Sequence, residues 1–390
     1  MRYFAISLIL IGLLSSCQKE NRSSFFKRPE DQMLRLNQIQ ILASHNSYHL
    51  RTDDTVLYFL NSVKSLLPSS LNPLDLDYTH EPFDVQMSQY GIRGLELDIY
   101  NDPQGGAYAV RHINTIMGLN DNSGIAELNE PGFKVLHIKD IDFNSLQPTF
   151  KLSLKAIKAW SDEHPGHLPL FVNVETKTES PGDNDQLVKF GFEPAPKFDL
   201  TSTDRLDAEV KEVFGDDLQS IITPDKLRGD LKTLNQVVQL NAWPLLGECR
   251  GKIMFIMEGE MVSLYKQGRQ SLKGRTMFTY ESRPNDDAVF IILNDPLKSK
   301  TEISTRVLEG YIVRTRADAF ENARRGDYLQ SYAAFESGAQ IVTTDYYRPD
   351  PRAGLAQGWA RYEVKMPDGG FARKNPINAS RVDIPSVLTE

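Results

Sequence analysis

The sequence predicts an α/β fold, a TIM-type (β/α)8 barrel in regular or distorted form, with long loops at its catalytic mouth. Three observations carry this prediction. From Ile39 onward, apolar runs typical of strands alternate with stretches whose apolar residues recur every three or four positions. A chain of 390 residues is long enough for one large barrel. Several apolar runs end in acidic, basic or imidazole side chains, and a barrel places its active site at those strand ends.

The elements follow from these runs in order. The predicted strands cover residues 39–43, 94–100, 107–110, 135–138, 168–174, 252–257, 289–293, 311–313 and 340–343. The predicted helices cover residues 150–163, 204–214 and 307–325. Long loops are expected over 180–203 and 294–305, and residues 348–390, rich in Pro, Gly and Arg, are expected to wrap the outside of the barrel.

The N-terminus has the pattern of a targeting segment. Arg2 precedes an apolar run over residues 3–14, which is too short to span a bilayer as a mature helix. Leu14-Ser15-Ser16-Cys17 then resembles a bacterial lipobox, which implies cleavage before Cys17 and lipidation of its thiol. An ordinary signal peptide with a chance cysteine is the alternative. The predicted organisation is a signal peptide over 1–16, a lipidated tether over 17–30 and one catalytic barrel domain over 31–390. The protein is then expected at the bacterial cell envelope, anchored to the outer membrane or cell surface.

Composition narrows the possible partners. The formal net charge of -8 argues against nucleic acid as a partner, because non-specific binding to phosphates needs basic surface. Contact with a membrane is therefore expected through the lipid anchor or local features. The chain has two cysteines, so lipidation of Cys17 leaves Cys249 alone, and Cys249 is expected to be a packed small side chain.

Two acidic residues share one face of the second predicted strand. Glu96 and Asp98 are two positions apart, so both side chains point to the same side, and Leu95, Leu97 and Ile99 point to the other. Two carboxylates on an inward face resist burial unless a cation neutralises them. A solvated edge of an amphipathic strand is the alternative for this pattern taken alone.

Basic and acidic residues also end two later strands. Glu175 follows a strongly apolar run, and Lys177 lies on the same face of the strand. This pattern indicates either part of a functional site or a plain surface ion pair between the two residues. Arg314 and Arg316 share another face, where their guanidinium groups are suited to holding a phosphate or to pairing with the acids of the barrel.

Histidines complete the set. His45 and Asn46 end the first strand, and His112 follows the run over 107–110. Either histidine alone is more often structural than catalytic, and Asn46 alone is consistent with a turn. Together with the carboxylates, they suit a hard cation such as Ca²⁺ and acid–base cleavage of a phosphodiester.

The order and surroundings of these residues resemble the calcium-dependent phosphoinositide-specific phospholipase C family, in its compact secreted bacterial and fungal branch. The resemblance rests on Ala43-Ser44-His45-Asn46-Ser47-Tyr48, Tyr78-Thr79-His80-Glu81-Pro82, Leu95-Glu96-Leu97-Asp98-Ile99-Tyr100 and the segment over 311–318. It implies a TIM-type barrel and one Ca²⁺ ion held by Asn46, Glu96, Asp98 and Glu175. It also implies that His45 and His112 are catalytic, with Lys177, Arg314 and Arg316 as candidate contacts to substrate.

The expected function is calcium-dependent cleavage of a phosphoinositide, or of a related phosphodiester, to diacylglycerol or an alcohol and an inositol phosphate. Two alternatives stay open. A glycerophosphodiester phosphodiesterase also uses a barrel, a metal and paired histidines, but typically has His-Arg where this chain has His45-Asn46. A non-catalytic surface lipoprotein that binds lipids or glycans is the second alternative.

Overall fold

A closed barrel of parallel strands forms the centre of the molecule. The computed structural model describes residues 28–67, 71–355 and 359–390. Within them, eight parallel strands close on each other in the order β1-β9-β8-β7-β6-β5-β4-β2, and β2 pairs back with β1. These strands are β1 (Ile39–Ser44), β2 (Gly94–Tyr100), β4 (Leu170–Thr176), β5 (Ile253–Gly259), β6 (Phe278–Glu281), β7 (Phe290–Ile292), β8 (Ile312–Arg316) and β9 (Ile341–Thr344). The predicted TIM-type fold is confirmed.

The barrel closes where β1 meets β2, and a glycine allows this close approach. Ala43 pairs with Gly94 at this seam. A Cβ atom on Gly94 would lie 2.6 Å from the Cβ of Ala43, closer than two carbon atoms can approach. A side chain at position 94 would therefore push β2 away from β1.

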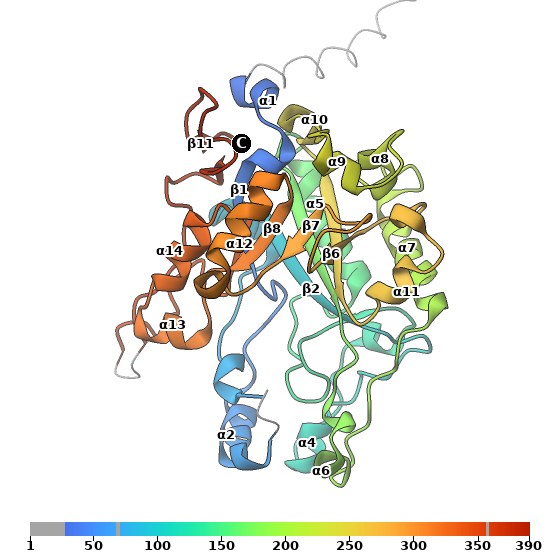
Figure 1. The fold of residues 1–390 in the computed structure, drawn as a ribbon. Helices are drawn as coiled ribbons and strands as arrows, with labels where there is room; N and C mark the ends of the chain where they lie inside the picture. Colours follow the sequence, from blue (N-terminus) through green and yellow to red (C-terminus); the bar gives the residue numbers. More distant parts are fainter. Residues whose placement is uncertain (1–27, 68–70, 356–358) are drawn as a thin grey trace, which may run out of the picture.

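Helices cover the outside of the barrel (Figure 1). Side chains cap several of them, as with Thr149, whose Oγ1 accepts from the amide of Leu152 at the start of α5. The helices are α1 (Pro29–Met33), α2 (Asp54–Ser62), α3 (Phe83–Gln89), α4 (His112–Ile116), α5 (Phe150–Glu163), α6 (Asp185–Val188), α7 (Leu200–Phe214), α8 (Pro224–Arg228), α9 (Asn235–Gln239), α10 (Leu246–Cys249), α11 (Val262–Lys266), α12 (Pro296–Glu309), α13 (Phe320–Arg325) and α14 (Leu329–Glu336). Among the described helices, none combines the length and apolar character needed to cross a membrane.

Three short strands lie outside the barrel. β3 (Lys134–Val135) pairs antiparallel with the end of β2. β10 (Ala372–Lys374) pairs antiparallel with the start of β1 and with β11 (Val387–Leu388). The C-terminal segment thus lies against the outside of the barrel, where the Glu390 carboxylate forms an ion pair with the buried Arg93 guanidinium at 2.8 Å.

Several element predictions were wrong. Residues 107–110 form a turn with one isolated bridge instead of a strand, and β6 was not predicted. The predicted helix over 307–325 is interrupted by β8, and the predicted loop over 294–305 contains most of α12. The physical reason is local. Asp295 caps the amide of Lys298 and Pro296 fits the first turn of a helix, so α12 begins before the predicted start at residue 307. Gly310, in the left-handed region, then ends α12.

The two ends of the barrel differ in their loops. α2, α4 and α6 lie on extended loops that follow β1, β2 and β4, at the carboxyl ends of the strands (Figure 1, lower end). α1, α10 and the C-terminus lie at the opposite end. The carboxyl end is therefore the mouth at which a barrel of this type carries its functional side chains.

Candidate metal centre and active site

Three carboxylates from two neighbouring strands meet at the mouth. Glu96 and Asp98 lie on β2, and Glu175 lies on β4 in register with Asp98. One oxygen atom of each lies within 4.8 Å of the others. Glu96 and Asp98 are buried, and Glu175 is partly buried. The sequence prediction of a shared face therefore holds, and the three oxygen ligands suit a hard divalent cation.

Basic side chains balance part of this negative charge. Arg314 on β8 donates to Glu96 Oε2 at 2.5 Å and to Glu258 Oε1 at 2.8 Å. Lys177 Nζ lies 3.0 Å from Asp98 Oδ2. Burial opposes the charge of Lys177, but the neighbouring Asp98 carboxylate raises the pKa of Lys177 above its usual value. Arg314 thus pairs with the acids of the barrel, one of the two arrangements that the sequence allows.

Burial changes the protonation of the cluster. Burial, together with the nearby carboxylates and against the effect of Arg314, raises the pKa of Glu96 to about 8. Burial and the neighbouring Asp98 raise the pKa of Glu175 to about 7. A cation among these oxygens would favour the ionised forms, so protons and a metal ion compete for the same groups.

Asn46 and Asp98 each have a buried oxygen atom without a hydrogen-bond partner among the described residues. Asn46 follows β1 in the left-handed region with φ +44°, which asparagine tolerates better than most residues. Its Nδ2 donates to the Tyr78 hydroxyl at 2.9 Å, and its Oδ1 has no partner. Asp98 Oδ1 is likewise unpartnered. Because an unsatisfied buried oxygen is costly, both atoms fit a bound cation.

His45 is held beside this cluster by Asp345. Its Nδ1 lies 2.9 Å from Asp345 Oδ1, and its Nε2 lies 4.0 Å from Glu96 Oε1. Arg316 also donates to Asp345, at 2.9 Å, and lies 3.3 Å from His45 Nε2. Burial and the Arg316 charge, partly offset by Asp345, lower the pKa of His45 to about 4. His45 is therefore neutral near pH 7, with Nδ1 donating to the Asp345 carboxylate and the unprotonated Nε2 accepting from Arg316.

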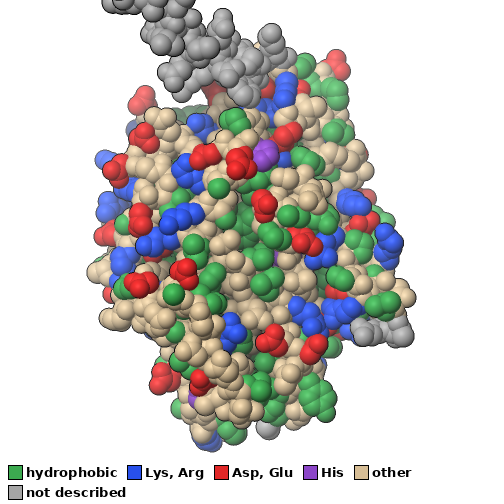
Figure 2. Space-filling model, turned by 180° about the vertical axis from the view of Figure 1, so that it is seen from behind, with side chains coloured by type: hydrophobic (Ala, Val, Ile, Leu, Met, Phe, Trp, Pro, Cys, Tyr) green, Lys and Arg blue, Asp and Glu red, His purple; other side chains and the backbone are tan. Residues whose placement is uncertain are grey.

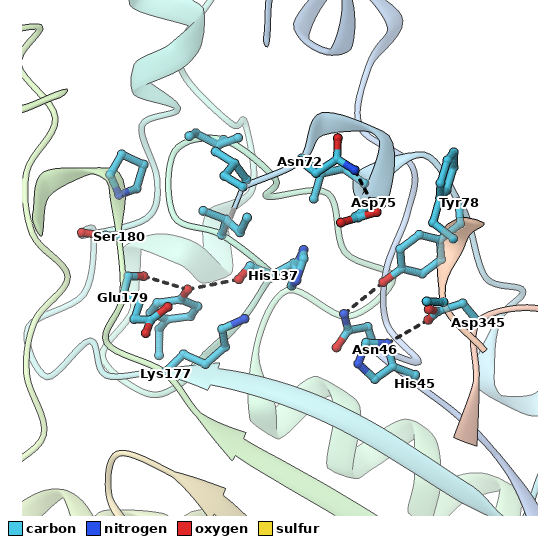
Figure 3. A pocket seen from close by; sticks show the side chains of 18 of the residues that line it. His45, Asn46, Asn72, Asp75, Tyr78, His137, Lys177, Glu179, Ser180 and Asp345 are labelled. Atoms are coloured by element: carbon cyan, nitrogen blue, oxygen red, sulfur yellow. Dashed lines mark hydrogen bonds and ion pairs between the residues drawn. The ribbon is translucent and has the colours of Figure 1, made fainter. Parts of the chain in front are cut away.

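The structure brings His137, and not His112, to the same cavity. His137 follows β3 and lines the cavity (Figure 3). Its Nδ1 lies 2.8 Å from Asp142 Oδ2. Asp142 Oδ2 also lies 2.8 Å from the buried His49 Nε2. His112 begins α4, and its Nε2 donates to the carbonyl of Phe190 at 2.8 Å. His137 thus lines the cavity beside His45, and His112 does not.

The mouth contains a cavity of about 410 Å³ (Figure 3). Its polar lining includes His45, Asn46, His137, Lys177, Arg316 and Asp345. Of the three basic residues expected to contact substrate, Lys177 and Arg316 line this cavity, and Arg314 lies deeper, almost fully buried. Asp345, Asp142 and His137 were not predicted as site residues. The usable signal for His137 was its place directly after a short strand beside β2.

The barrel mouth combines a cluster of carboxylates with two imidazoles, each held by a carboxylate. These groups are suited to metal-assisted acid–base chemistry. A sequence profile described as "Phosphoinositide phospholipase C, Ca2+-dependent" matches residues 34–376, most of the chain. The chain belongs to this family. No match was found among curated proteins.

Solved structures share the fold. The calcium-dependent phosphoinositol-specific phospholipase C from the Gram-negative bacterium Pseudomonas sp., in its apo form, is 15% identical with a TM-score of 0.52, covering 90% of this chain and 98% of that chain. A second crystal form of it gives 14% identity and a TM-score of 0.52, with 90% and 99% covered. The Ca²⁺-dependent phosphatidylinositol-specific phospholipase C from Streptomyces antibioticus is 19% identical with a TM-score of 0.43, covering 80% and 94%. At these identities the Pseudomonas structures support the fold alone.

Proposed function

We propose that the protein is a calcium-dependent phosphodiesterase that cleaves a phosphoinositide, or a related phosphodiester, to diacylglycerol or another alcohol and an inositol phosphate. The observation that carries the proposal is the cluster of Glu96, Asp98 and Glu175 carboxylates, in which Asp98 Oδ1 is buried and unpartnered. Asn46, just after the neighbouring strand β1, adds a second unpartnered buried oxygen, Oδ1. These four residues would hold one Ca²⁺ ion. Mg²⁺ should substitute poorly, because it demands tighter octahedral geometry.

In the reaction proposed, the inositol 2-hydroxyl attacks phosphorus. The new bond joins that oxygen to phosphorus, the bond from phosphorus to the glyceryl oxygen breaks, and the leaving oxygen takes up a proton. Ca²⁺, when bound, supplies charge neutralisation at the phosphoryl oxygen and acidifies the attacking hydroxyl. Neutral His45, whose Nε2 is unprotonated, is suited to accept the hydroxyl proton.

His137 is the second imidazole in this proposal. Asp142 accepts from Nδ1 of His137 and so leaves its Nε2 side for the substrate. His137 would then donate the proton to the leaving oxygen or stabilise the charged phosphorane. Lys177 and Arg316 line the cavity and are proposed to contact the phosphate or the ring hydroxyls. Arg314, which holds Glu96 at 2.5 Å, is proposed to position that ligand.

A panel of phosphodiesters tests the reaction. Release of product from phosphatidylinositol, from glycerophosphoinositol and from glycerophosphocholine is measured with calcium and in excess chelator. Calcium-dependent cleavage of the inositol diesters supports the proposal. Preference for glycerophosphocholine would favour a glycerophosphodiester phosphodiesterase, and absence of cleavage throughout would favour a binding protein.

We also propose that Cys17 is lipidated and anchors the protein at the cell envelope. The signal peptide, Cys17 and most of the tether lie outside the described residues. The support is the sequence pattern before Cys17. Because α1 lies at the end of the barrel opposite the mouth, an anchor ahead of it favours a mouth that faces away from the anchoring membrane (Figure 1). Intact-mass analysis of the membrane fraction tests this proposal: a mature terminus other than an acylated Cys17 would contradict it.

A further inference from the structure

A second cavity lies at the mouth, beside the one that holds the proposed reaction. It has a volume of about 190 Å³ and lies between α2, α4 and the segment that follows α6. All of its lining residues are apolar, among them Phe59, Ile116 and Phe190. We propose that this cavity binds a hydrocarbon chain of the lipid substrate. The inference rests on the proposed function and names the part of the substrate that the polar cavity does not hold.

Large apolar side chains are exposed around this cavity. Phe190 is 58% exposed, Val188 48%, Leu119 46% and Ile116 37%. Figure 2 shows hydrophobic side chains at the surface of this lower end of the molecule. An apolar ligand that covers the cavity and its exposed apolar rim removes this surface from water, which favours binding.

The apolar cavity adjoins the reaction cavity. Ile141 and Leu187 line both cavities, so one layer of side chains separates the proposed phosphodiester site from the apolar cavity. The reaction cavity carries imidazoles and basic groups, and its neighbour carries apolar groups alone. Together the two match an amphiphile with a charged headgroup and an apolar chain.

The chemistry of the lining favours a hydrocarbon over a peptide. A peptide carries an N–H and a C=O group at nearly every residue, and each needs a hydrogen-bond partner when buried. The residues that line the cavity offer no polar side chain to such groups. An acyl chain has no such requirement, so it can be buried here without leaving a polar group unpaired.

His112 fixes one wall of this cavity. Its Nε2 donates to the Phe190 carbonyl at 2.8 Å, and its ring meets the Phe192 ring edge-on with centroids 4.9 Å apart. A Cβ atom on Gly191, which has φ +88°, would lie 2.9 Å from His112 Nε2. His112 therefore holds α4 against the segment after α6, and is a positioning residue for the apolar cavity.

The test measures chain-length dependence without a membrane. Phosphatidylinositols with butanoyl, hexanoyl and octanoyl chains are used below their micellar concentrations, with glycerophosphoinositol as the substrate without chains. For the wild-type protein, kcat/KM should rise with chain length, by at most about four-fold for each buried methylene. Phe190→Ser, which alters an exposed side chain, and Val63→Phe, which fills the cavity, should each flatten this rise. Leu308→Ser, 68% exposed on α12, is the matched control.

Two outcomes of the kinetic assay would overturn the inference. One is an unchanged rise with chain length in both cavity variants. The other is an equal loss of activity on glycerophosphoinositol, because the cavity then merely supports the reaction site. A dimer in the wild-type protein that Phe190→Ser dissociates, with no effect on chain length, would also overturn it in favour of a second copy of this chain.

Binding of fluorescent cis-parinaric acid separates this inference from the proposed reaction. Binding that Val63→Phe abolishes, in a protein that cleaves no diester, supports the hydrocarbon site and overturns the proposed reaction. Calcium-dependent cleavage without parinarate binding and without a chain-length effect overturns the hydrocarbon site and leaves the reaction standing.

Discussion

Replacing Asp98 with asparagine tests the metal centre by removing charge while keeping shape. Asp98 is fully buried, with Oδ1 unpartnered among the described residues and Oδ2 at 3.0 Å from Lys177 Nζ. Four carboxylates oppose two basic groups in this cluster, so its charge is two negative units when all are ionised, which matches one divalent cation. The carboxylates are Glu96, Asp98, Glu175 and Glu258, and the basic groups are Arg314 and Lys177.

The loss of calcium affinity in Asp98→Asn should be large. A unit charge 4 Å from another contributes about 4 kcal/mol at an effective dielectric constant of about 20, roughly a thousand-fold in affinity. Since the amide of the introduced asparagine would still offer a neutral oxygen, we expect calcium affinity to fall by at least about a hundred-fold.

Whether Asp98→Asn raises or lowers the stability of the metal-free protein depends on the ion pair between Asp98 and Lys177. Treated as an unpaired clustered carboxylate, Asp98 would destabilise the fold, and its removal would raise stability. Because its loss leaves the partly buried Lys177 without its ion-pair partner, we expect the free energy of unfolding in chelator to fall instead, by about 1–3 kcal/mol. Glu175 also stabilises the charged form of Lys177, and its carboxylate should limit this loss of stability.

Calorimetric calcium titration and thermal unfolding, with calcium and in chelator, measure both effects. For the wild-type protein, calcium at a hundred times its dissociation constant should stabilise the fold by about 2.7 kcal/mol. Asp162→Asn on α5, an exposed carboxylate paired with Lys158, is the control and should change neither value. An Asp98→Asn variant that retains the calcium-induced stabilisation, or that unfolds at a higher temperature in chelator, would refute this reasoning.

The histidines, the protonation of the carboxylates and the N-terminal cysteine each give a further prediction. His137→Ala should lower kcat by about 10²- to 10⁴-fold, and His112→Ala should leave kcat on glycerophosphoinositol within a few-fold of wild type; equal losses would refute this assignment. In the folded state the pKa of Glu96 is raised to about 8 and that of Glu175 to about 7, from an ordinary value of 4.5. In chelator, both groups therefore stabilise the fold fully below pH 4.5, and this contribution to the free energy of unfolding should be lost as the pH rises through 7 and 8. Calorimetry in buffers of different ionisation heat at about pH 6 should show proton release on calcium binding, and its absence would contradict the raised values. Cys17→Ser should move the protein from the membrane fraction to the soluble one, as fractionation and immunoblotting would show.

The carboxylate cluster was predictable because strand geometry is local. Glu96 and Asp98 share a face in any strand that contains both, and Glu175 ends an apolar run strong enough to identify. Parallel strands then bring their carboxyl ends together, which is why β2 and β4 place these side chains within 4.8 Å. The barrel itself was predictable from the same alternation of strands and helices.

Positions that depend on loops were not predictable in the same way. Both His112 and His137 follow β2, but only the long loop and its packing decide which ring reaches the cavity. The resemblance to the family favoured His112, and the antiparallel pairing of β3 with β2 brings His137 to the cavity. The strand β6, Phe278–Glu281, mixes apolar and polar residues over four positions, so it lacks the continuous apolar run that identified β7.

The measurement that tests the central claim most directly is a calcium titration in which binding and cleavage of phosphatidylinositol are followed in the same sample. The account predicts no cleavage in excess chelator, full recovery with calcium, and saturation of both signals at one ion per chain. Full cleavage in chelator, or calcium binding unchanged when Glu96, Asp98 and Glu175 are all replaced by their amides, would contradict it.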